Sequence, residues 1–548
     1  MRKRAHIFII LLLIILVFCL FRKTTSHNFN SDDYLVLYHA SQTGYTPADA
    51  LKEFTRPSWG LYYRPAITLF FDLLESRFKL EPAKYHLVSL LCYSVLCIQV
   101  YMLGFLLSKK MLVAGGAAII FMTMTVHAQA IFWISSLNGV VENIFSLAAL
   151  IVFIRWRQKP NTWLYAGSLG LFVFALFLKE SAVALPIILI LYDSLLGGTF
   201  TFRQAAKRSA KSTWPFVLLG MLFVILRGII MKQANLPPSL TSFQIATSLL
   251  GLWHALLMTF SPIDWALAVN WFNKGQAAGM FFYVLAGVAL VAVAGVPLLL
   301  RRYTAVFLIG WILAGAIPVV ALGLVPSERH VVFSSAGGAV LIAIVFWKFA
   351  DRLSRRSVAA STAILAFLVL AFSATSFSYL NERRVTWKTA SDAAARLVWR
   401  TTAAYPAPAP DTTFFFLNVP DTYDGAFIFR FDNLSYALRL AYNDPSLRAV
   451  RIILPDQVTP GMLANPAYAY FRISAMGGNV YLGQSAQAVS APEYVPLLGL
   501  PYLRPNISYI SNWSEYRNSP FLVYRPGHLI PETPEHLKVI LQGLYSLN

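Results

Sequence analysis

The chain has 548 residues, of which 57% are hydrophobic and only 13% are charged, and its mean hydropathy is +0.59. A soluble globular protein carries about 25% charged residues, so this composition excludes that class. The net charge of +20 could indicate nucleic-acid binding, but the basic residues lie mainly in short loops between apolar runs, where they determine membrane topology. We therefore predict an integral membrane protein that binds no nucleic acid.

Apolar runs recur along the first two thirds of the chain, and each is long enough to cross a bilayer, which takes about 20 helical residues. The first run follows Arg2-Lys3-Arg4 and has no small-residue cleavage site behind it, so we interpret it as an uncleaved helix. Together the runs predict a polytopic α-helical fold with about 11 transmembrane helices, over residues 7–22, 86–107, 111–130, 131–154, 162–178, 181–197, 213–230, 281–300, 304–323, 331–350 and 358–378.

The distribution of basic residues gives these helices an orientation. With the N-terminus in the cytoplasm, the alternate loops hold 17 Lys or Arg residues against Asp351 as the one clear acid. This pattern satisfies the positive-inside rule. It predicts that residues 379–548 lie on the extracytoplasmic side of the plasma membrane, or of the inner membrane in a bacterium.

Residues 243–268 are the ambiguous apolar stretch. A full crossing there would invert every later loop and place Arg301-Arg302 outside the cytoplasm. We therefore predict an external segment that is interfacial or re-entrant, with Trp253, Trp265 and Trp271 as aromatic anchors; a spanning helix is the alternative.

The chain divides into a predicted transmembrane domain over residues 1–378 and a predicted extracytoplasmic domain over residues 379–548. The second domain combines β-rich runs with a run of helical spacing, which predicts a small α/β domain. The β-rich runs are Thr413–Asn418, Ala426–Phe431 and Ala449–Leu454, and the helical run is Leu434–Tyr442. Tripeptides that begin at Asn433, Asn506 and Asn512 match the N-glycosylation pattern.

Residues 23–85 form the longest predicted outer loop, and a loop of this length is uncommon unless it has a function. The loop carries Asp32-Asp33 just beyond the first helix and Tyr63-Arg64-Pro65 further along. Other loops predicted on the same face contribute His127, Lys179-Glu180 and Glu328-Arg329-His330. A carboxylate can act as a general base, and Arg and Lys can hold phosphate oxygens. This face therefore suits an anionic headgroup and proton removal from a hydroxyl.

Each of these residues also has a structural interpretation. Asp32-Asp33 could cap a helix, Arg64 could lie at the membrane interface, and Lys179-Glu180 could be an exposed ion pair. Glu142 lies well inside a predicted span, where a lone carboxylate is costly. It either pairs with a buried polar group or lines a cavity, and the sequence leaves both alternatives open.

The sequence predicts no cofactor and no metal-binding cluster. Cys19, Cys92 and Cys97 all fall in apolar segments and have no metal-ligand spacing, so we expect them to serve only in packing. Asp32-Asp33 could still contribute to a divalent metal site.

Six short motifs occur in order along roughly residues 1–400, and they resemble the GT-C superfamily of multi-spanning glycosyltransferases. The resemblance is to the protein O-mannosyltransferase branch, including the transmembrane members that carry TPR repeats. The motifs are Ser31-Asp32-Asp33-Tyr34, Tyr62-Tyr63-Arg64-Pro65, Tyr85-His86-Leu87-Val88, Phe132-Trp133-Ile134-Ser135, Leu178-Lys179-Glu180-Ser181-Ala182-Val183-Ala184-Leu185-Pro186 and Pro326-Ser327-Glu328-Arg329-His330.

The resemblance implies a reaction and roles for the site residues. The donor would be a sugar on a polyprenyl phosphate, and the sugar would move to a hydroxyl with inversion on the outer face. Asp32 would be the general base and Asp33 an orienting or acceptor-side group. Arg64, Lys179 and Arg329 would hold the lipid phosphate. Further candidate site residues are Tyr63, His86, His127, Glu180, Glu328 and His330.

The chain departs from the family at three points. His330 stands where a Tyr is common, Ser89 stands where an Asn often follows the His86 motif, and no TPR repeat is present. The missing repeats leave the acceptor open among protein, lipid and glycan.

Two other functions are compatible with many helices and a charged outer face. A lipid-linked glycan polymerase or ligase of the O-antigen type usually has its large outer loop late in the chain, whereas here it comes first. A transporter or lipid-binding scaffold would show paired internal repeats, and we find none.

Overall fold

The computed structural model describes the chain except for residues 1, 45, 61, 199–201, 235–244, 264–280, 282–283, 286, 290–302, 323, 325, 356, 418, 454–467, 474–479, 486–492, 498–499, 505–506, 511–520, 526–527 and 533–548. The contacts divide it into two units. One comprises residues 1–27 and 43–385, and the other comprises residues 28–42 and 386–548.

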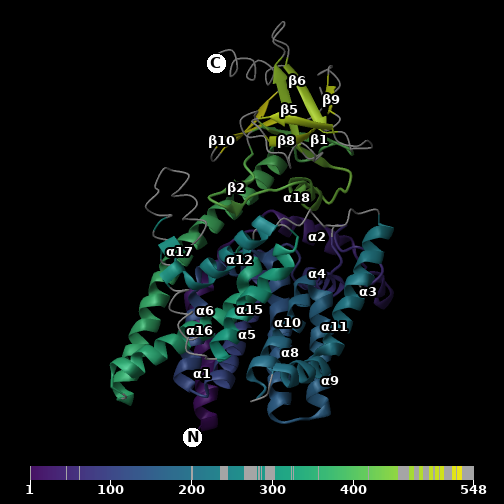
Figure 1. Ribbon diagram of the computed structural model, residues 1–548. Helices are drawn as coiled ribbons and strands as arrows, with labels where there is room; N and C mark the ends of the chain where they lie inside the picture. The colour runs from purple at the N-terminus through teal and green to yellow at the C-terminus, as the bar shows by residue number, and fades with distance from the viewer. Residues whose placement is uncertain are drawn as a thin grey trace. The chain divides into compact units, whose positions relative to one another are not determined.

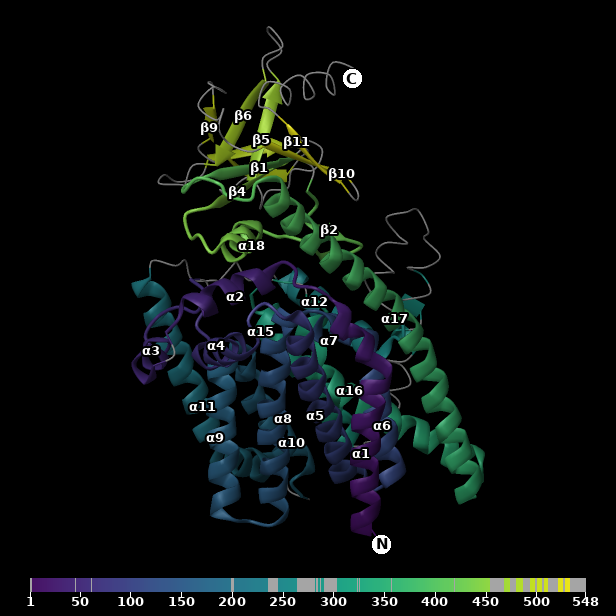
Figure 2. The ribbon, with the colours of Figure 1, turned by 180° about the vertical axis from the view of Figure 1, so that it is seen from behind.

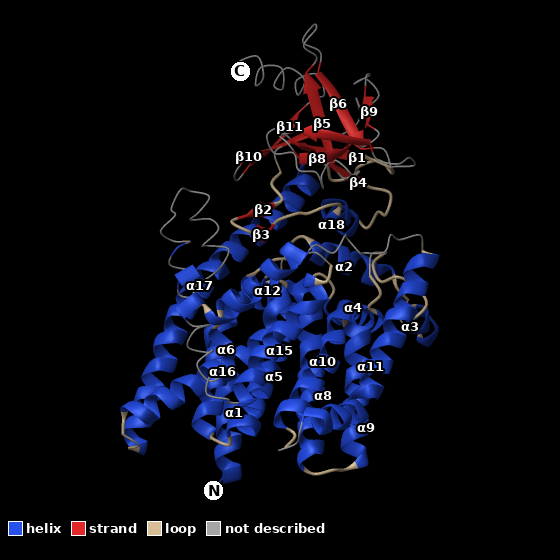
Figure 3. Cartoon of the chain, viewed as in Figure 1, coloured by secondary structure: helices blue, strands red, loops and turns tan. Residues whose placement is uncertain are grey.

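The described part of the first unit consists of helices joined by turns and loops, with an isolated β-bridge between Ser58 and Tyr62 (Figures 1 and 3). Short 3-10 turns (η) link several of the helices. In chain order the elements are α1 (Arg2–Phe21), η1 (Arg22–Ser26), α3 (Pro47–Lys52), α4 (Pro65–Phe78), α5 (Pro82–Ser108), α6 (Met111–Thr123), η2 (Thr125–His127), α7 (Ala128–Phe132), η3 (Ile134–Ser136), α8 (Leu137–Gln158), α9 (Thr162–Leu178), η4 (Glu180–Ala184), α10 (Leu185–Leu196), α11 (Phe202–Gln233), α12 (Ile245–Phe260), α15 (Tyr303–Val320), α16 (Glu328–Leu353) and α17 (Val358–Ala404), which continues into the second unit.

The predicted fold class, a polytopic α-helical membrane protein with a small C-terminal α/β region, is confirmed. The predicted number of spans is not. Within the described residues, 7 helices are long and apolar enough to cross a membrane, and α6 with the η2–α7 segment, bent by 57°, makes an eighth. The predicted span 181–197 becomes η4 and the 12-residue α10, and the predicted span 281–300 lies largely outside the described residues.

The ambiguous stretch 243–268 contains α12, a helix of 16 residues. Its apolar part, Ser248–Phe260, is shorter than the spanning helices, and α12 packs against α15 and α16. Trp253 lies on this helix, whereas Trp265 and Trp271 lie outside the described residues. Whether α12 crosses the membrane stays a prediction.

The core of the first unit lies where α5, α8 and α16 pack. About two thirds of the most apolar part of each helix is buried, against 17% for α1, because neighbouring helices surround them. Helix α16 contacts α6, α8, α12 and α15, and α1, α5 and α6 run side by side (Figure 2). Close helix packing needs small residues: a Cβ at Gly315 of α15 would stand 2.4 Å from Ser334 Oγ of α16.

Helix α17 is longer than a bilayer requires. At about 1.5 Å per residue its 47 residues extend about 70 Å, whereas the hydrocarbon core is about 30 Å thick. The predicted span 358–378 accounts for the apolar first half of the helix. The second half, which carries the charged residues, therefore leaves the membrane.

The second unit contains a mixed sheet with strand order β11-β10-β1-β4-β5-β6-β9 (Figure 3). Strand β1 pairs in parallel with β10 and β4, and β4 pairs in parallel with β5; the remaining neighbours are antiparallel. The strands of this sheet are β1 (Thr413–Leu417), β4 (Arg448–Ile453), β5 (Tyr468–Ile473), β6 (Val480–Ser485), β9 (Ile507–Ile510), β10 (Phe521–Arg525) and β11 (His528–Glu532). Two separate antiparallel pairs are formed by β2 (Thr422–Tyr423) with β3 (Ala426–Phe427) and by β7 (Glu493–Leu497) with β8 (Leu500–Arg504).

The parallel pair β1–β4 is joined through α18 (Asn433–Tyr442), which packs on β4. This crossover is the β-α-β arrangement that parallel neighbours require. The predicted helix over Leu434–Tyr442 and the strands at β1 and β4 are confirmed, while the run Ala426–Phe431 forms only the two residues of β3. Helix α2 (Asp32–Gln42) packs against α18, so residues 28–42 fold with the C-terminal region.

Helix α4 carries a buried acid, Asp72, whose charge lowers the stability of the first unit. The side chain is 5% exposed, and neither carboxylate oxygen accepts a hydrogen bond from any described residue. Burial, with the charge of Glu53 next, raises the pKa of Asp72 to about 7. Below pH 4 the carboxyl is protonated in folded and unfolded chains alike, and above pH 7 the folded chain holds an unfavourable charge.

We therefore expect Asp72→Asn to stabilise the protein at pH 8, on the order of 2 kcal/mol, because the raised pKa disfavours the charged form by about 1.4 kcal/mol per unit. The gain should shrink as the pH falls toward 4. Thermal unfolding of the detergent-solubilised protein across this range measures it. Asp49→Asn is the matched control, because Lys52 and Thr46 lower the pKa of Asp49 to about 2 and its removal should not stabilise. A gain that did not depend on pH would contradict this explanation.

Candidate functional site

A polar pocket lies in the first unit where α8, α15 and α16 meet the junction between α9 and η4. Apolar side chains of α15 and α16 complete its wall. Its volume is about 10 Å³, room for about one water molecule. The polar residues that line it are Glu142, Asn143, Lys179, Ser181, Arg329 and His330. Lys179, Arg329 and His330 are predicted site residues, so the structure brings together parts of two motifs that lie about 150 residues apart.

Arg64 and Glu180 form a two-pronged ion pair beside this pocket. Arg64 Nε lies 2.8 Å from Glu180 Oε2, and Arg64 Nη2 lies 2.6 Å from Glu180 Oε1. The guanidinium also stacks 4.1 Å from the centroid of the Tyr62 ring. Burial alone would raise the pKa of Glu180, but the charge and hydrogen bonds of Arg64 outweigh it and lower the pKa to about 2. Arg64 is therefore held in one orientation by a partner that stays ionised.

Lys179 is the buried cation of the pocket, with 6% of its surface exposed. It follows the last residue of α9, whose helix ends there because Lys179 is extended. Burial, and next the positive charge of Arg64, lower the pKa of Lys179. A Cβ at Gly139 of α8 would stand 3.1 Å from Lys179 Nζ, so the glycine leaves the space that the ammonium occupies.

Glu142 also lines the pocket. Its Oε1 accepts a hydrogen bond from Ser146 (2.6 Å) and its Oε2 accepts one from Ser181 (3.1 Å). Both alternatives that the sequence left open are therefore met, since Glu142 has polar partners and lines a cavity. The charges of Glu142 and Glu180 act on Lys179, and so do those of the cations Arg64 and Arg329.

His330 enters the pocket from the first turn of α16. Its Nδ1 accepts the backbone N–H of Ser327 at 3.1 Å, which closes a capping box at the start of the helix. In the neutral ring the proton must then sit on Nε2, so His330 presents a donor N–H to the pocket. Arg329 precedes it and stacks 5.2 Å from the Trp133 ring centroid. The pocket thus has three donors and suits an oxyanion.

Glu328 faces different partners from the two residues that follow it. Its Oε1 lies 3.3 Å from Arg383 Nη2 of α17, and its Oε2 accepts the backbone N–H of Gln129 at 3.2 Å. Both side chains are buried. Glu328 therefore ties the start of α16 to α7 and α17, and it does not line the polar pocket.

Three predicted candidates are buried in packing contacts. Tyr63 donates its hydroxyl to the carbonyl of Phe54 at 3.0 Å. His127 uses both ring nitrogens, with the Tyr93 hydroxyl and the Ser335 hydroxyl each at 2.7 Å. His86 packs its ring against His27, and neither of its nitrogens bonds to a described residue. None of the three lines the polar pocket.

The acidic pair lies in the second unit, at the start of α2. Asp33 is 1% exposed, and its Oδ2 accepts the backbone N–H of Asn30 at 3.1 Å, which closes the turn that opens the helix. Asp32 is partly exposed, and its Oδ1 accepts a hydrogen bond from Asn433 Nδ2 at 2.8 Å. The two carboxylates thus have different surroundings, and Asp32 is the accessible one.

Asn433, which begins one of the glycosylation tripeptides, is buried. Its side chain is 3% exposed and its amide nitrogen is bonded to Asp32 and Ser31. The other two tripeptides, at Asn506 and Asn512, lie outside the described residues. Among the described residues no group of three or more His, Cys, Asp or Glu side chains could hold a metal ion.

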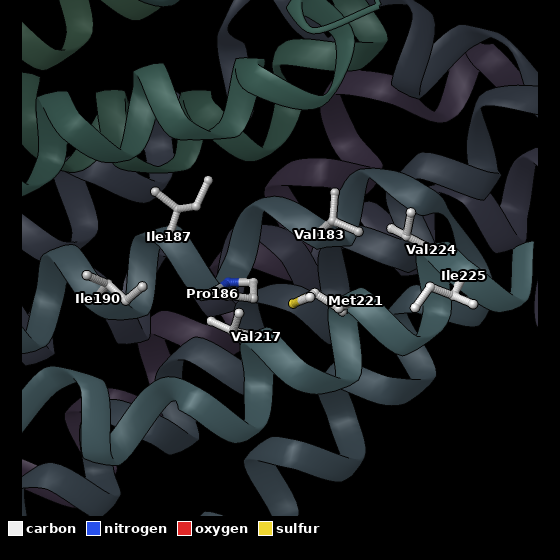
Figure 4. Close-up of a pocket in the computed structure, with 9 residues that line it drawn as sticks. Val183, Pro186, Ile187, Ile190, Val217, Met221, Val224 and Ile225 are labelled. Carbon is white, nitrogen blue, oxygen red and sulfur yellow. The ribbon is translucent and has the colours of Figure 1, made fainter. Parts of the chain in front are cut away.

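An apolar groove of about 390 Å³ begins four residues beyond Lys179 and runs between α10 and α11 (Figure 4). Val183, Pro186, Ile187 and Ile190 form one wall. The other wall comes from α11 and consists of Val217, Gly220, Met221, Val224 and Ile225. This groove could not be predicted from the sequence, because it depends on which faces of two apolar helices meet.

Sequence reasoning also missed how α8 contributes to the polar pocket. Gly139, Glu142, Asn143 and Ser146 are spaced by three, one and three residues within an apolar run, which places them on one face of the helix. A polar stripe of this kind inside a predicted span was the available signal. No polar stripe of this kind marks Arg383 or Asn433, so the sequence contains no such signal for either residue.

No protein-family model matches the chain. A protein O-mannosyl-transferase of Caenorhabditis elegans, F38B6.6, is 24% identical over 357 residues, which is 58% of this chain. The predicted resemblance to the protein O-mannosyltransferases is confirmed. The chain spans about half, 48%, of that relative's length.

Two solved structures are similar in outline. The oligosaccharyltransferase of Archaeoglobus fulgidus with a tethered acceptor peptide gives a TM-score of 0.47 at 12% identity, covering 85% of this chain and 66% of its own. ArnT of Cupriavidus metallidurans gives 0.45 at 10% identity, covering 83% of this chain and 86% of its own.

Proposed function

We propose that the chain is a membrane glycosyltransferase that moves a sugar from a polyprenyl-phosphate donor to a hydroxyl acceptor. The observation that carries the proposal is the buried pocket in which Lys179, Arg329 and the Nε2–H of His330 converge. Such a set of donors suits one oxygen of a phosphate, and the pocket has room for a group of about that size. The O-mannosyltransferase relative supports the choice of reaction.

In the proposed reaction the acceptor oxygen attacks the anomeric carbon from the face opposite the phosphate. The bond from that oxygen to the carbon forms as the bond from the carbon to the phosphate oxygen breaks, which inverts the configuration. Asp32 takes the hydroxyl proton, and the departing polyprenyl phosphate carries the electron pair. Lys179 and Arg329 stabilise the charge that develops on it, and Arg64 supports the same phosphate, oriented by Glu180.

The apolar groove between α10 and α11 supports a lipid-linked donor. A phosphate held at Lys179 would leave its isoprenoid chain near Val183, at the beginning of the groove. Burial of isoprenoid carbons there would add binding energy at about 25 cal/mol per Å² of apolar surface. We place the reaction on the outer face of the membrane, with the N-terminus cytoplasmic, because the basic loops favour that orientation.

The test is transfer of radiolabelled sugar from a panel of polyprenyl-phosphate donors, with wild type and Asp32→Asn in membranes that contain native acceptors. We expect label to reach an acceptor with one sugar, and only in wild type. The KM for donors with a shortened isoprenoid chain should be higher, because these donors leave the groove between α10 and α11 unfilled. If correctly folded wild type consumes no donor, the proposal is wrong. Growth of a lipid-linked glycan would favour a polymerase, and uptake of a solute would favour a transporter.

A further inference from the structure

Asp32 is held by a residue from the C-terminal region, and this suggests a role for that region. Asn433 is the first residue of α18, and its Nδ2 donates to Asp32 Oδ1 at 2.8 Å and to Ser31 Oγ at 3.1 Å. An amide nitrogen has two hydrogens, so both are used. An ionised carboxylate can only accept, which fixes the amide orientation with its nitrogen toward Asp32.

The backbone in front of Asp32 adopts a conformation that needs support. Ser31 has φ of 47°, in the left-handed region that a serine rarely enters. Its N–H donates to the carbonyl of Ile428 at 2.9 Å, and its hydroxyl accepts from Asn433. The neighbouring Asn30 side chain donates to the carbonyl of Phe427 at 2.6 Å. Residues 427–433 therefore hold this turn on three sides, and strained backbone of this kind is found at functional sites.

Asn433 is itself fixed in place. Ser435, one half-turn further along α18, donates to Asp432 and accepts the backbone N–H of Ala449 on β4 at 2.9 Å. Arg451 of β4 donates to the carbonyls of Phe429 (2.6 Å) and Phe431 (3.1 Å). The chain on both sides of Asn433 is thus anchored to the sheet, so the amide cannot follow Asp32 if the carboxylate turns.

We propose that Asn433 is a positioning residue for the general base, and that the C-terminal region completes the catalytic centre by supplying it. The inference rests on the proposed function. Among the described residues, both hydrogen bonds to Asp32, from Asn433 and Ser31, fall on Oδ1. Oδ2 is thereby left to receive the proton of the acceptor hydroxyl. Loss of the amide would let the carboxylate rotate and would release the strained turn.

The experiment compares Asn433→Ala and the isosteric Asn433→Asp with Ser435→Ala, in the assay that establishes transfer by wild type and its loss in Asp32→Asn. Ser435→Ala is the matched control, because it loosens the same end of α18 without touching Asp32. We expect kcat to fall about 100-fold in Asn433→Ala, the effect of a displaced catalytic group, with the KM for donor little changed. In Asn433→Asp, kcat should fall at least as far, because the variant loses the N–H that bonds to Asp32 and places a second carboxylate against the first.

Rescue by a conservative variant separates positioning from stability. Asn433→His can present one ring N–H near the position of Nδ2, and it should recover part of the lost kcat at a melting temperature similar to that of Asn433→Ala. The inference is overturned if all Asn433 variants keep the kcat of wild type, or if kcat falls only in step with melting temperature as it does in Ser435→Ala. If wild type itself transfers no sugar, the proposed function fails and this role of Asn433 fails with it. If wild type transfers sugar but the Asn433 variants lose no more activity than Ser435→Ala, the role of Asn433 is wrong and the proposed function stands.

Discussion

Asp32→Asn is expected to lower kcat for sugar transfer by about 10²–10⁴-fold, the range over which general bases contribute. The amide is the same size as the carboxylate but cannot take the acceptor proton. Asn433 can still donate to the amide oxygen, so the start of α2 should keep its structure. Donor binding should therefore persist while turnover is lost, which transfer assays and donor-binding measurements on one preparation can separate.

Asp33 provides the contrast that makes this result interpretable. Its carboxylate is buried and bonded to the N–H of Asn30, so it stabilises a turn and has no access to an acceptor. Asp33→Ala should leave that N–H without its partner and cost about 1–3 kcal/mol of stability. Asp33→Asn, which keeps an accepting oxygen, should lose little turnover. If Asp33→Asn were inactive and Asp32→Asn active, the assignment of the base would be reversed.

The distinction between the two acids marks how far sequence reasoning reaches. The motifs predicted that Asp32-Asp33, Lys179 and Arg329 matter, because charged residues at the ends of apolar runs are costly unless they serve a function. The sequence could not predict that one acid is buried and the other accessible. Nor could it predict that Asn433, about 400 residues away, donates to Asp32, because the position of Asn433 depends on the packing of α18 on β4.

The polar pocket shows the same limit. Lys179 and Arg329 could be predicted from their motifs, and Glu142 was recognised as a costly buried acid without a role. Its role depends on how α8, η4 and α16 pack, since Ser181 and Ser146 approach Glu142 from different elements. Periodicity predicts the faces of helices but not which faces meet. The number of spans stays a prediction, because the predicted span 281–300 lies largely outside the described residues. Hydropathy reports apolar length, so it could not reveal that α7 is bent away from α6 within one predicted span.

The C-terminal region illustrates why the position of a side chain changes the interpretation of an experiment. Deletion of residues 380–548 would appear to test whether this region recruits the acceptor. The same deletion removes Asn433, Ile428 and Phe427, which hold the turn in front of Asp32. Loss of activity would follow even if the region had no contact with an acceptor. Single substitutions on the outer surface of α18 or the sheet are therefore the sharper test of recruitment.

Lys179→Met is expected to lower kcat/KM for the polyprenyl-phosphate donor by about 10²–10³-fold, the usual effect of removing one donor to a developing oxyanion. Methionine keeps most of the length of the side chain, so the space next to Gly139 stays filled. Lys52→Met is the matched control, because Lys52 is 63% exposed and pairs with Asp49 on its own helix. Lys179→Arg should recover part of the activity, limited by the space that Gly139 leaves.

Lys179 shares the pocket with Glu142, so its removal leaves a carboxylate without its nearest buried cation. The double variant Lys179→Met, Glu142→Gln removes both charges and should melt close to wild type, because removing a buried pair together is often neutral. It should remain inactive if Lys179 contacts the phosphate. Recovery of transfer in the double variant would instead mean that Lys179 serves only to balance Glu142, and the phosphate would then have to be held by Arg329, His330 and Arg64. The pair of variants therefore separates a cation that binds the substrate from a cation that stabilises the fold, which the buried position of Lys179 alone does not distinguish.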